Sequence, residues 1–228
     1  MTTADNALVI MTKAPQAGQS KTRLVPPLTF AEAAGLAHAL LIDQLDNLSN
    51  FHGAARYIAF TPDSTAGYFA AFQRQGYTSF PQRGDSLGER MGDVFRRLFE
   101  SGCRAVVLIG SDLPAVPVKT FDQAYAALET AEVDIVLGPS DDGGYYLVGM
   151  KRPILEMFER ITWSRADVLR STTEKLDALG LKYKLLCAGY DIDKIADLGR
   201  LWDELDTRGG VMNNTLTLLR QFRRRGII

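Results

Sequence analysis

The stretch Ala105-Val-Val-Leu-Ile-Gly-Ser-Asp-Leu-Pro114 decides the fold of this chain. Its first five residues are all apolar, and the run ends abruptly at Gly110-Ser111-Asp112. An apolar run without polar alternation is typical of a strand buried on both faces, as in a parallel sheet covered by helices. We therefore expect residues 105–109 to form a central strand with helices on both sides of the sheet.

Asp112 stands at the place where such sheets bind their ligands. In open α/β sheets, ligands bind just beyond the carboxyl ends of the strands, and Pro114 cannot continue the strand. A carboxylate at this place suits a hard cation such as Mg²⁺ and, through the cation, a pyrophosphate. The alternative interpretation is that Asp112 only caps a helix that begins near Val116.

Composition excludes several classes of protein. The 228 residues are enough for one large α/β domain or two small ones. A net charge of -1 gives no general attraction to nucleic acid or membrane, so we expect neither as a partner. Cys103 and Cys187 are the only cysteines, which predicts no disulfide framework. The first apolar run, Ala7 to Met11, is too short for a signal peptide, and no segment has transmembrane length, so we expect a cytoplasmic protein without membrane insertion.

Strand and helix patterns alternate along the chain without a linker or repeat. The expected strands are residues 7–11, 55–61, 77–80, 105–109, 133–137, 145–148 and 183–186. Expected helices include one opened by a capping box of Thr29 and Glu32, and others over residues 86–100, 121–130 and 165–179. This alternation predicts an α/β fold with a mostly parallel sheet. The short return from Leu137 to Tyr145 leaves no room for a crossover helix, so we expect one local antiparallel strand.

The loop after the first strand, Met11 to Leu24, is basic and contains a glycine. Its cations are Lys13, Lys21 and Arg23, and cations at a strand end suit a phosphate chain. The loop is not a P-loop, because only two residues separate Gly18 from Lys21 and the motif's earlier glycine is missing. The dinucleotide fingerprint G-x-G-x-x-G is also missing. The alternative interpretation is a solvated basic loop.

Three further segments have two interpretations each. At Gly84 and Gly88, the lack of a side chain would let the backbone approach a base or ribose. The alternative interpretation is a plain loop before a helix, without a ligand. The turn Gly138 to Tyr146 places two carboxylates beside two glycines, which suits hydroxyl binding, although Asp-Gly-Gly is also a common tight turn. The carboxylates of Tyr190-Asp-Ile-Asp193 would complete a metal site with Asp112 or cap the following helix.

Taken together, these segments resemble the nucleotide-diphospho-sugar transferases, which have the family A glycosyltransferase fold. More narrowly, the chain is similar to an uncharacterised bacterial glycosyltransferase-like family. The shared motifs are Lys-Thr-Arg-Leu at 21–24, Gly-Ser-Asp-x-Pro at 110–114 and Asp-Gly-Gly-Tyr-Tyr at 142–146. Gly84, Leu87, Gly88, Arg90 and Met91 resemble that family's second nucleotide loop.

The resemblance implies one three-layer α/β/α domain over residues 1–228. It implies a nucleotide over about residues 1–115 and an acceptor over about residues 116–228. The nucleotide-binding residues are then Lys13, Gly18, Lys21, Arg23, Gly84, Leu87, Gly88, Arg90 and Ser111. The acceptor-binding residues are Gly143, Gly144, Tyr145 and Tyr146.

The resemblance also implies a bound Mg²⁺ or Mn²⁺. Asp112 matches the family's metal-binding aspartate, and Asp193 matches a residue that holds the same metal in related nucleotidyltransferases. The chain departs from those patterns in two places: Gly110 stands where an Asp-x-Asp motif has its first aspartate, and Lys194-Ile-Ala replaces Thr-Pro-Glu. The sequence leaves open whether Asp191 or Asp193 is the second ligand.

Three functions fit this set of residues. The first is metal-dependent glycosyl transfer from a nucleotide-diphospho-sugar to a small acceptor, with Asp112, Lys21 and Asp142 as the catalytic residues. The second is nucleotidyl transfer, in which a nucleoside triphosphate condenses with a phosphorylated small molecule and releases pyrophosphate. The third is a nucleotide-binding regulator without turnover. The base, the sugar, the acceptor and the oligomeric state do not follow from the sequence.

Overall fold

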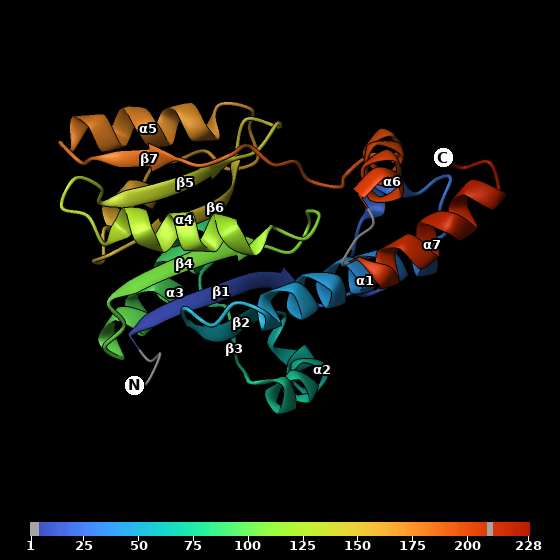
Figure 1. Ribbon diagram of the computed structural model, residues 1–228, viewed down its shortest axis with the longest axis horizontal. Coiled ribbons are helices and arrows are strands. Elements are labelled where there is room, and N and C mark those ends of the chain that lie inside the picture. Colours follow the sequence, from blue (N-terminus) through green and yellow to red (C-terminus); the bar gives the residue numbers. More distant parts are fainter. Residues whose placement is uncertain (1–4, 209–211) are drawn as a thin grey trace.

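A seven-stranded sheet forms the centre of the computed structural model, which describes residues 5–208 and 212–228 (Figure 1). The strands are β1 (Asn6–Lys13), β2 (Ala55–Thr61), β3 (Tyr77–Pro81), β4 (Ala105–Gly110), β5 (Ile135–Pro139), β6 (Tyr145–Met150) and β7 (Tyr183–Leu185). Their order across the sheet is β3-β2-β1-β4-β6-β5-β7. The predicted central position of β4 is confirmed. The predicted antiparallel strand is β6, which runs opposite to both β4 and β5.

Two of the helices begin at a capping box. The helices are α1 (Phe30–Ser49), α2 (Ala66–Ala70), α3 (Leu87–Glu100), α4 (Val118–Leu128), α5 (Val168–Ala178), α6 (Ile195–Arg208) and α7 (Asn213–Arg224). The predicted capping box at α1 is present: the Thr29 hydroxyl accepts from Glu32 N, and the Glu32 carboxylate accepts from Thr29 N at 2.8 Å. Ser86 and Glu89 form a second capping box at α3. Each box satisfies backbone donors that the first helical turn leaves unpaired.

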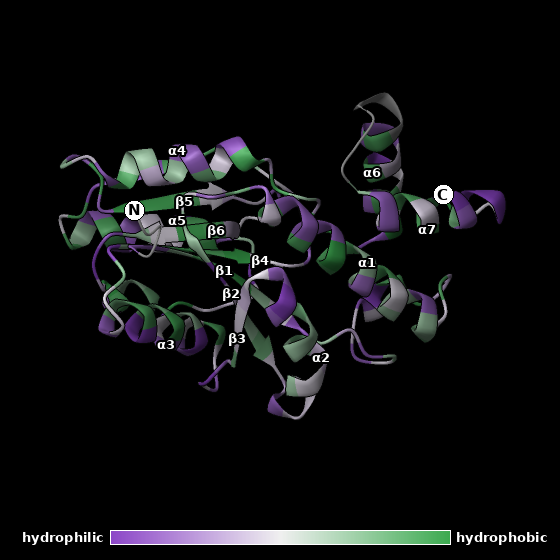
Figure 2. Cartoon of the chain, turned by 60° about the horizontal axis from the view of Figure 1, so that its bottom comes forward, coloured by the Kyte–Doolittle hydropathy of each residue, from purple (hydrophilic) through white to green (hydrophobic). Residues whose placement is uncertain are grey.

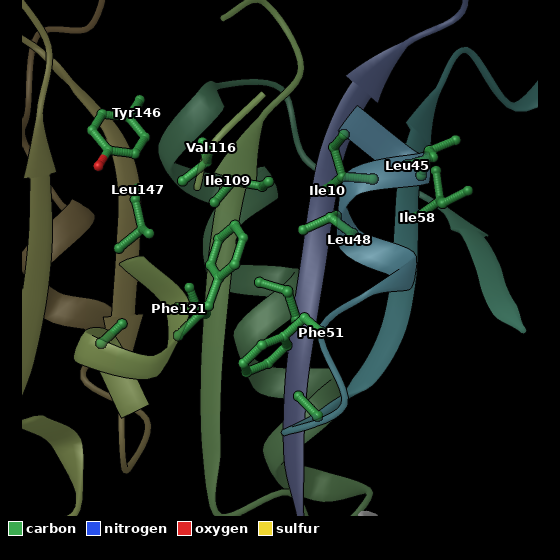
Figure 3. Packing of buried hydrophobic residues seen from close by; sticks show 14 of the residues in the cluster. Ile10, Leu45, Leu48, Phe51, Ile58, Ile109, Val116, Phe121, Tyr146 and Leu147 are labelled. Carbon is green, nitrogen blue, oxygen red and sulfur yellow. The ribbon is translucent and has the colours of Figure 1, made fainter. Parts of the chain in front are cut away.

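Helices cover both faces of the sheet, which gives the predicted three layers. Alternate strand residues point to opposite faces, so Ile10 joins one buried cluster and its neighbour Val9 joins another. The first cluster packs α1, α2 and α4 on one face, with Leu45 of α1 and Phe121 of α4 among its members (Figure 3). The second packs α3 and α5 on the other face. Hydrophobic colour is concentrated on the strands and the inner sides of these helices (Figure 2).

A third cluster lies beyond the carboxyl ends of the central strands. It joins the first half of α1, through Leu36 and Leu40, to α6 and α7, which lie together at one end of the molecule in Figure 1. The buried Asp43 carboxylate of α1 accepts from Thr215 N at 2.8 Å and from Asn214 N at 3.1 Å, at the start of α7. This arrangement places the C-terminal helices beside the edge of the sheet where ligands are expected.

Element boundaries differ from the predictions at two helices. The helix predicted over 121–130 starts earlier, at Val118, because Pro117 has a fixed φ of -55° and suits the position before a first helical turn. The helix predicted from Arg165 starts only at Val168. Arg160 and Ser164 have φ angles of 58° and 62°, in the left-handed region, so the chain before Val168 follows a loop instead of a helix.

Candidate functional site

Two adjoining pockets lie at the carboxyl ends of β1 and β4 and at the amino end of the antiparallel β6. The larger has a volume of about 330 Å³ and the smaller about 170 Å³, and they share Thr12, Lys13, Ser111 and Asp112. The smaller pocket is lined by the basic loop and Asp193. The larger one extends past Leu87 and Arg90 to Tyr145, Tyr146 and Asp191. Segments far apart in the sequence therefore meet at one edge of the sheet, as expected for an α/β fold.

The Lys21 ammonium lies between two carboxylates. Its Nζ is 2.6 Å from Asp112 Oδ1 and 3.7 Å from Asp193 Oδ1, and it donates to the Asp112 carbonyl at 3.3 Å. The Lys21 side chain is only 3% exposed. Arg23 Nη1 contacts the second oxygen of Asp193 at 2.9 Å. Two of the three predicted phosphate-binding cations are thus already paired with the two predicted metal ligands.

The local chain path explains why Asp193 reaches this place. Ile192 N donates to the Asp112 carbonyl at 2.8 Å, and the Ile192 side chain is buried in the third cluster. Asp197 accepts from the backbone N–H groups of Asp193 and Lys194, and so caps the start of α6. The capping contact thus comes from Asp197, outside the predicted segment, while Asp193 turns its carboxylate toward Lys21.

The donor set fits a hard divalent cation. Asp112 and Asp193 converge on one positive atom, the Lys21 nitrogen, so their oxygens already surround a common cation. Mg²⁺ prefers oxygen ligands and is commonly held by one or two carboxylates together with substrate phosphates and water. Within residues 5–208 and 212–228, no group of three or more His, Cys, Asp or Glu side chains is placed to hold a metal. A metal here would therefore depend on ligand oxygens for the rest of its shell.

Asp191 lies in the larger pocket and has a different partner. Its Oδ2 accepts from the Ser140 hydroxyl at 2.7 Å. Burial raises the pKa of the Asp191 carboxyl to about 6; the bond from Ser140 opposes this rise, and the charges of Asp142 and Asp112 add to it. Of the two candidates for a second metal ligand, Asp193 is the one that shares Lys21 with Asp112.

The Asp142 loop is held by its own backbone. Asp142 Oδ1 accepts from Gly144 N at 2.9 Å, and its side chain is otherwise exposed. Gly143 has a φ of 89°, and a Cβ there would lie 1.9 Å from the Ala166 carbonyl oxygen. The missing side chain of Gly143 therefore permits close packing on the chain at Ala166, whereas the sequence predicted an approach to a ligand.

The two predicted tyrosines of the acceptor side line the larger pocket. The Tyr146 hydroxyl donates to the Cys187 carbonyl at 3.0 Å, and its side chain packs against Gly138 and Gly189. The Tyr145 ring packs edge-on against Trp163, with ring centroids 6.2 Å apart. Burial raises the pKa of the Tyr146 hydroxyl to about 12, so it stays protonated near neutral pH.

Only some residues of the second glycine-bearing turn, Gly84 to Arg90, line the larger pocket. Leu87 is 48% exposed and lines the larger pocket with Arg90, whose Nε donates to the Gly84 carbonyl at 2.9 Å. Gly88 instead faces the Trp163 indole, 2.8 Å from the position of a Cβ. Gly18 has a φ of 77° and lines neither pocket. Of this predicted set, Leu87 and Arg90 reach the larger pocket, while Gly84 and Gly88 line a separate cavity of about 650 Å³ beside Trp163.

Sequence reasoning missed Gln82 and Arg200. The Gln82 amide lines the larger pocket and donates to the carbonyls of Ala59 and Thr12, at 2.8 and 3.2 Å. Its position directly after β3 could have identified it, since the strand ends carry the site. Arg200 of α6 contacts Asp141 Oδ2 at 2.7 Å and lies 3.6 Å from the centre of the Tyr190 ring. No local sequence pattern connects these residues.

Comparison with solved structures agrees with this fold. A crystal structure described as "putative nucleotide-diphospho-sugar transferase" from Desulfovibrio desulfuricans G20 is 30% identical, with a TM-score of 0.89 over 97% of this chain and 96% of that one. The fold and the site define a transferase with the architecture of the nucleotide-diphospho-sugar transferases. The chain belongs to the family described as "Uncharacterized protein conserved in bacteria (DUF2064)", whose model matches residues 44–165.

More distant structures share the fold alone. A cytidylyltransferase from Leptospira borgpetersenii serovar Hardjo-bovis is 13% identical, with a TM-score of 0.64 over 99% of this chain and 97% of that one. The inositol-1-phosphate CTP transferase from T. maritima is 14% identical, with a TM-score of 0.55 over 94% and 97% of the two chains. No curated protein matches the sequence. Within the described residues, no helix is both long and apolar enough to cross a membrane.

Proposed function

We propose that the protein is a metal-dependent glycosyltransferase that uses a nucleotide-diphospho-sugar donor and a small acceptor with a free hydroxyl. The observation that carries this proposal is the charge balance of the smaller pocket. Its charged lining consists of three cations, Lys13, Lys21 and Arg23, and two carboxylates, Asp112 and Asp193. The excess of positive charge, increased by one divalent cation, suits the phosphates of a nucleotide donor, and the likeness to the structure described as a putative nucleotide-diphospho-sugar transferase supports a diphospho-sugar as that donor.

The chain's residues have separate tasks in this reaction. Asp112 and Asp193 would hold a Mg²⁺ or Mn²⁺, which stabilises the negative charge on a departing nucleoside diphosphate. Lys21 and Arg23 bind the phosphate oxygens, and backbone and side-chain groups near Gly84, Leu87, Arg90 and Ser111 bind the nucleoside. The bond between the anomeric carbon and the diphosphate oxygen breaks as the acceptor oxygen bonds to that carbon.

The acceptor side lies along the larger pocket. Tyr145, Tyr146 and Asp191 line its far wall, and the exposed Asp142 carboxylate stands on the neighbouring loop. Asp142 orients the acceptor hydroxyl and accepts its proton as the new bond forms. The loop is fixed by the bond from Gly144 N to Asp142 Oδ1, which limits the positions that the carboxylate can take.

Nucleotidyl transfer is the second candidate, and one observation favours it. Arg90 lines the larger pocket beside Lys13, so an extended phosphate chain would meet a fourth cation there. In that reaction the same pocket binds a nucleoside triphosphate, a phosphorylated small molecule attacks the α-phosphorus, and pyrophosphate leaves.

A product assay distinguishes these reactions. The protein is incubated with Mg²⁺ and a panel of nucleotide-diphospho-sugars, and separately with nucleoside triphosphates and sugar phosphates, each with small hydroxylated acceptors. Release of a nucleoside diphosphate supports the proposal, whereas release of pyrophosphate replaces it with nucleotidyl transfer. Nucleotide binding without either product supports the regulator that the sequence left open. Asp112→Asn is the inactive variant, and Asp122→Asn, an exposed aspartate on α4 that lines neither pocket, is the matched control.

A further inference from the structure

We propose that the Lys21 ammonium is an internal counter-ion, which holds Asp112 and Asp193 in the nucleotide-free protein and must leave them before a divalent cation binds. Metal binding is then coupled to nucleotide binding, because phosphates offer Lys21 new partners while the metal takes the carboxylates. The coupling to nucleotide rests on the proposed function, but the counter-ion role itself does not.

The distances place the Lys21 ammonium where a cation shared by the two carboxylates would lie. Lys21 Nζ is 2.6 Å from Asp112 Oδ1, and Mg²⁺ binds carboxylate oxygens at about 2.1 Å. A metal on that oxygen and also on Asp193 would occupy the space between the two carboxylates, where the ammonium now lies. Two positive ions in contact repel each other strongly in a partly buried site. The metal therefore competes with Lys21 for the same oxygens.

The position of Lys21 is built into the loop. Its backbone has φ 51° and ψ 37°, a left-handed conformation that is costly for a residue with a Cβ. Ser20 before it is fixed, since its hydroxyl donates to the Ala14 carbonyl and its N–H to the Gln16 carbonyl. Leu24 after it is buried in the third cluster. Both flanks are thus held, and the side chain between them is only 3% exposed.

The other two cations of the pocket are placed differently. The Arg23 side chain is 73% exposed and contacts Asp193 Oδ2, whereas Lys21 lies nearest to Oδ1 of that carboxylate, so Arg23 does not take the place between the two carboxylates. Lys13 lines the same pocket, and among the described residues it has no ion pair with either aspartate. Lys13 therefore contributes positive charge to the pocket without blocking the carboxylates, which makes it the matched control.

The test measures metal binding in the absence of nucleotide. Mn²⁺ affinity is determined by electron paramagnetic resonance for the wild-type protein, Lys21→Met and Lys13→Met. We expect Lys21→Met to bind Mn²⁺ roughly tenfold more tightly than the wild type, the effect of removing one charge-assisted contact that the metal must displace. We expect Lys13→Met to change the affinity by less than about threefold, as for loss of a solvated charge nearby. Adding Asp112→Asn to Lys21→Met should abolish the gain.

Two results would overturn the counter-ion role: an unchanged Mn²⁺ affinity in Lys21→Met, or an equal gain in Lys13→Met. If Lys21→Met does not unfold cooperatively, Lys21→Gln is measured in the same way and judged by the same two results. If the wild type turns over a nucleotide-sugar but Lys21→Met binds Mn²⁺ no more tightly, the proposed function stands and the counter-ion role of Lys21 is rejected. If Lys21→Met binds Mn²⁺ more tightly but the wild type turns over no nucleotide-sugar, the counter-ion role stands and the proposed function is rejected.

Discussion

Gly143→Ala should destabilise the protein more than an alanine at any other glycine of the site. Two costs combine at this position. A side chain at φ 89° is strained, which costs on the order of 1–2 kcal/mol. The new Cβ would also stand 1.9 Å from the Ala166 carbonyl oxygen, and both groups belong to backbone that does not rotate away.

Relief of that clash requires the two backbones to separate. The Gly143 carbonyl accepts from Leu169 N at 2.9 Å, so separation weakens a bond that ties the Asp142 loop to the start of α5. Such a bond contributes about 1 kcal/mol. We therefore expect a total loss of roughly 2–4 kcal/mol, which lowers Tm by about 4–16 °C in a protein of this size.

Two other glycines separate the contributions. Gly18→Ala adds a Cβ at φ 77° with nothing within 4 Å, so it has the strain without the clash and should cost only about 1 kcal/mol. At Gly144 the nearest atom to a new Cβ is Asp142 Oδ1 at 3.2 Å, the end of a side chain that can move slightly. Thermal unfolding followed by circular dichroism ranks the three variants. A Gly143→Ala protein as stable as Gly18→Ala would refute the packing role assigned to Gly143.

Three further variants test the site and the first helix cap. Asp112→Asn should abolish metal-dependent nucleotide binding, whereas Asp142→Asn should spare binding and lower turnover; equal loss of nucleotide affinity in calorimetry would refute this division. Lys21→Ala should weaken nucleotide binding by roughly tenfold, the worth of one charge-assisted hydrogen bond, and an unchanged affinity would remove the loop from the site. Bonding from Thr29 N and from the Arg225 guanidinium lowers the pKa of Glu32 to about 2. A folded pKa below the unfolded value of 4.5 adds stability above pH 4.5 that is lost as pH falls toward 2. The stability difference between the wild type and Glu32→Gln in urea titrations should therefore shrink over that range, and a difference independent of pH would contradict it.

The strands of the sheet could be predicted because each is marked by a pattern within a short stretch of sequence. The apolar run at residues 105–109 marks a strand buried on both faces, and the structure places β4 fourth among seven strands. The antiparallel β6 followed from chain length alone, since seven residues between Leu137 and Tyr145 cannot form a crossover helix. The capping boxes of α1 and α3 are likewise short-range sequence patterns.

The contacts within the site depend on where each side chain points in the folded protein, and the sequence pattern does not show this. Lys21 is predicted to bind phosphates, but the sequence pattern did not show that its side chain also contacts an aspartate 91 residues away. Gly88 was expected beside a nucleotide, but its helical position faces Trp163. Arg200 and Asp141 are 59 residues apart and meet only because α6 packs beside the carboxyl edge of the sheet. Each of these contacts requires the tertiary fold.

The pairing of opposite charges in the smaller pocket limits what kind of ligand can bind there. A ligand with phosphates alone must take Lys21 and Arg23 from Asp112 and Asp193, leaving two carboxylates close together without a cation. A metal alone must displace Lys21 from the carboxylates, leaving its buried ammonium without a negatively charged partner. A ligand that brings an anion and a divalent cation together leaves neither set of charges unpaired. Under the proposed function, the electrostatics of the pocket would therefore favour the metal complex of a phosphate ester over either component, which is the form in which a metal-dependent transferase would receive its nucleotide donor.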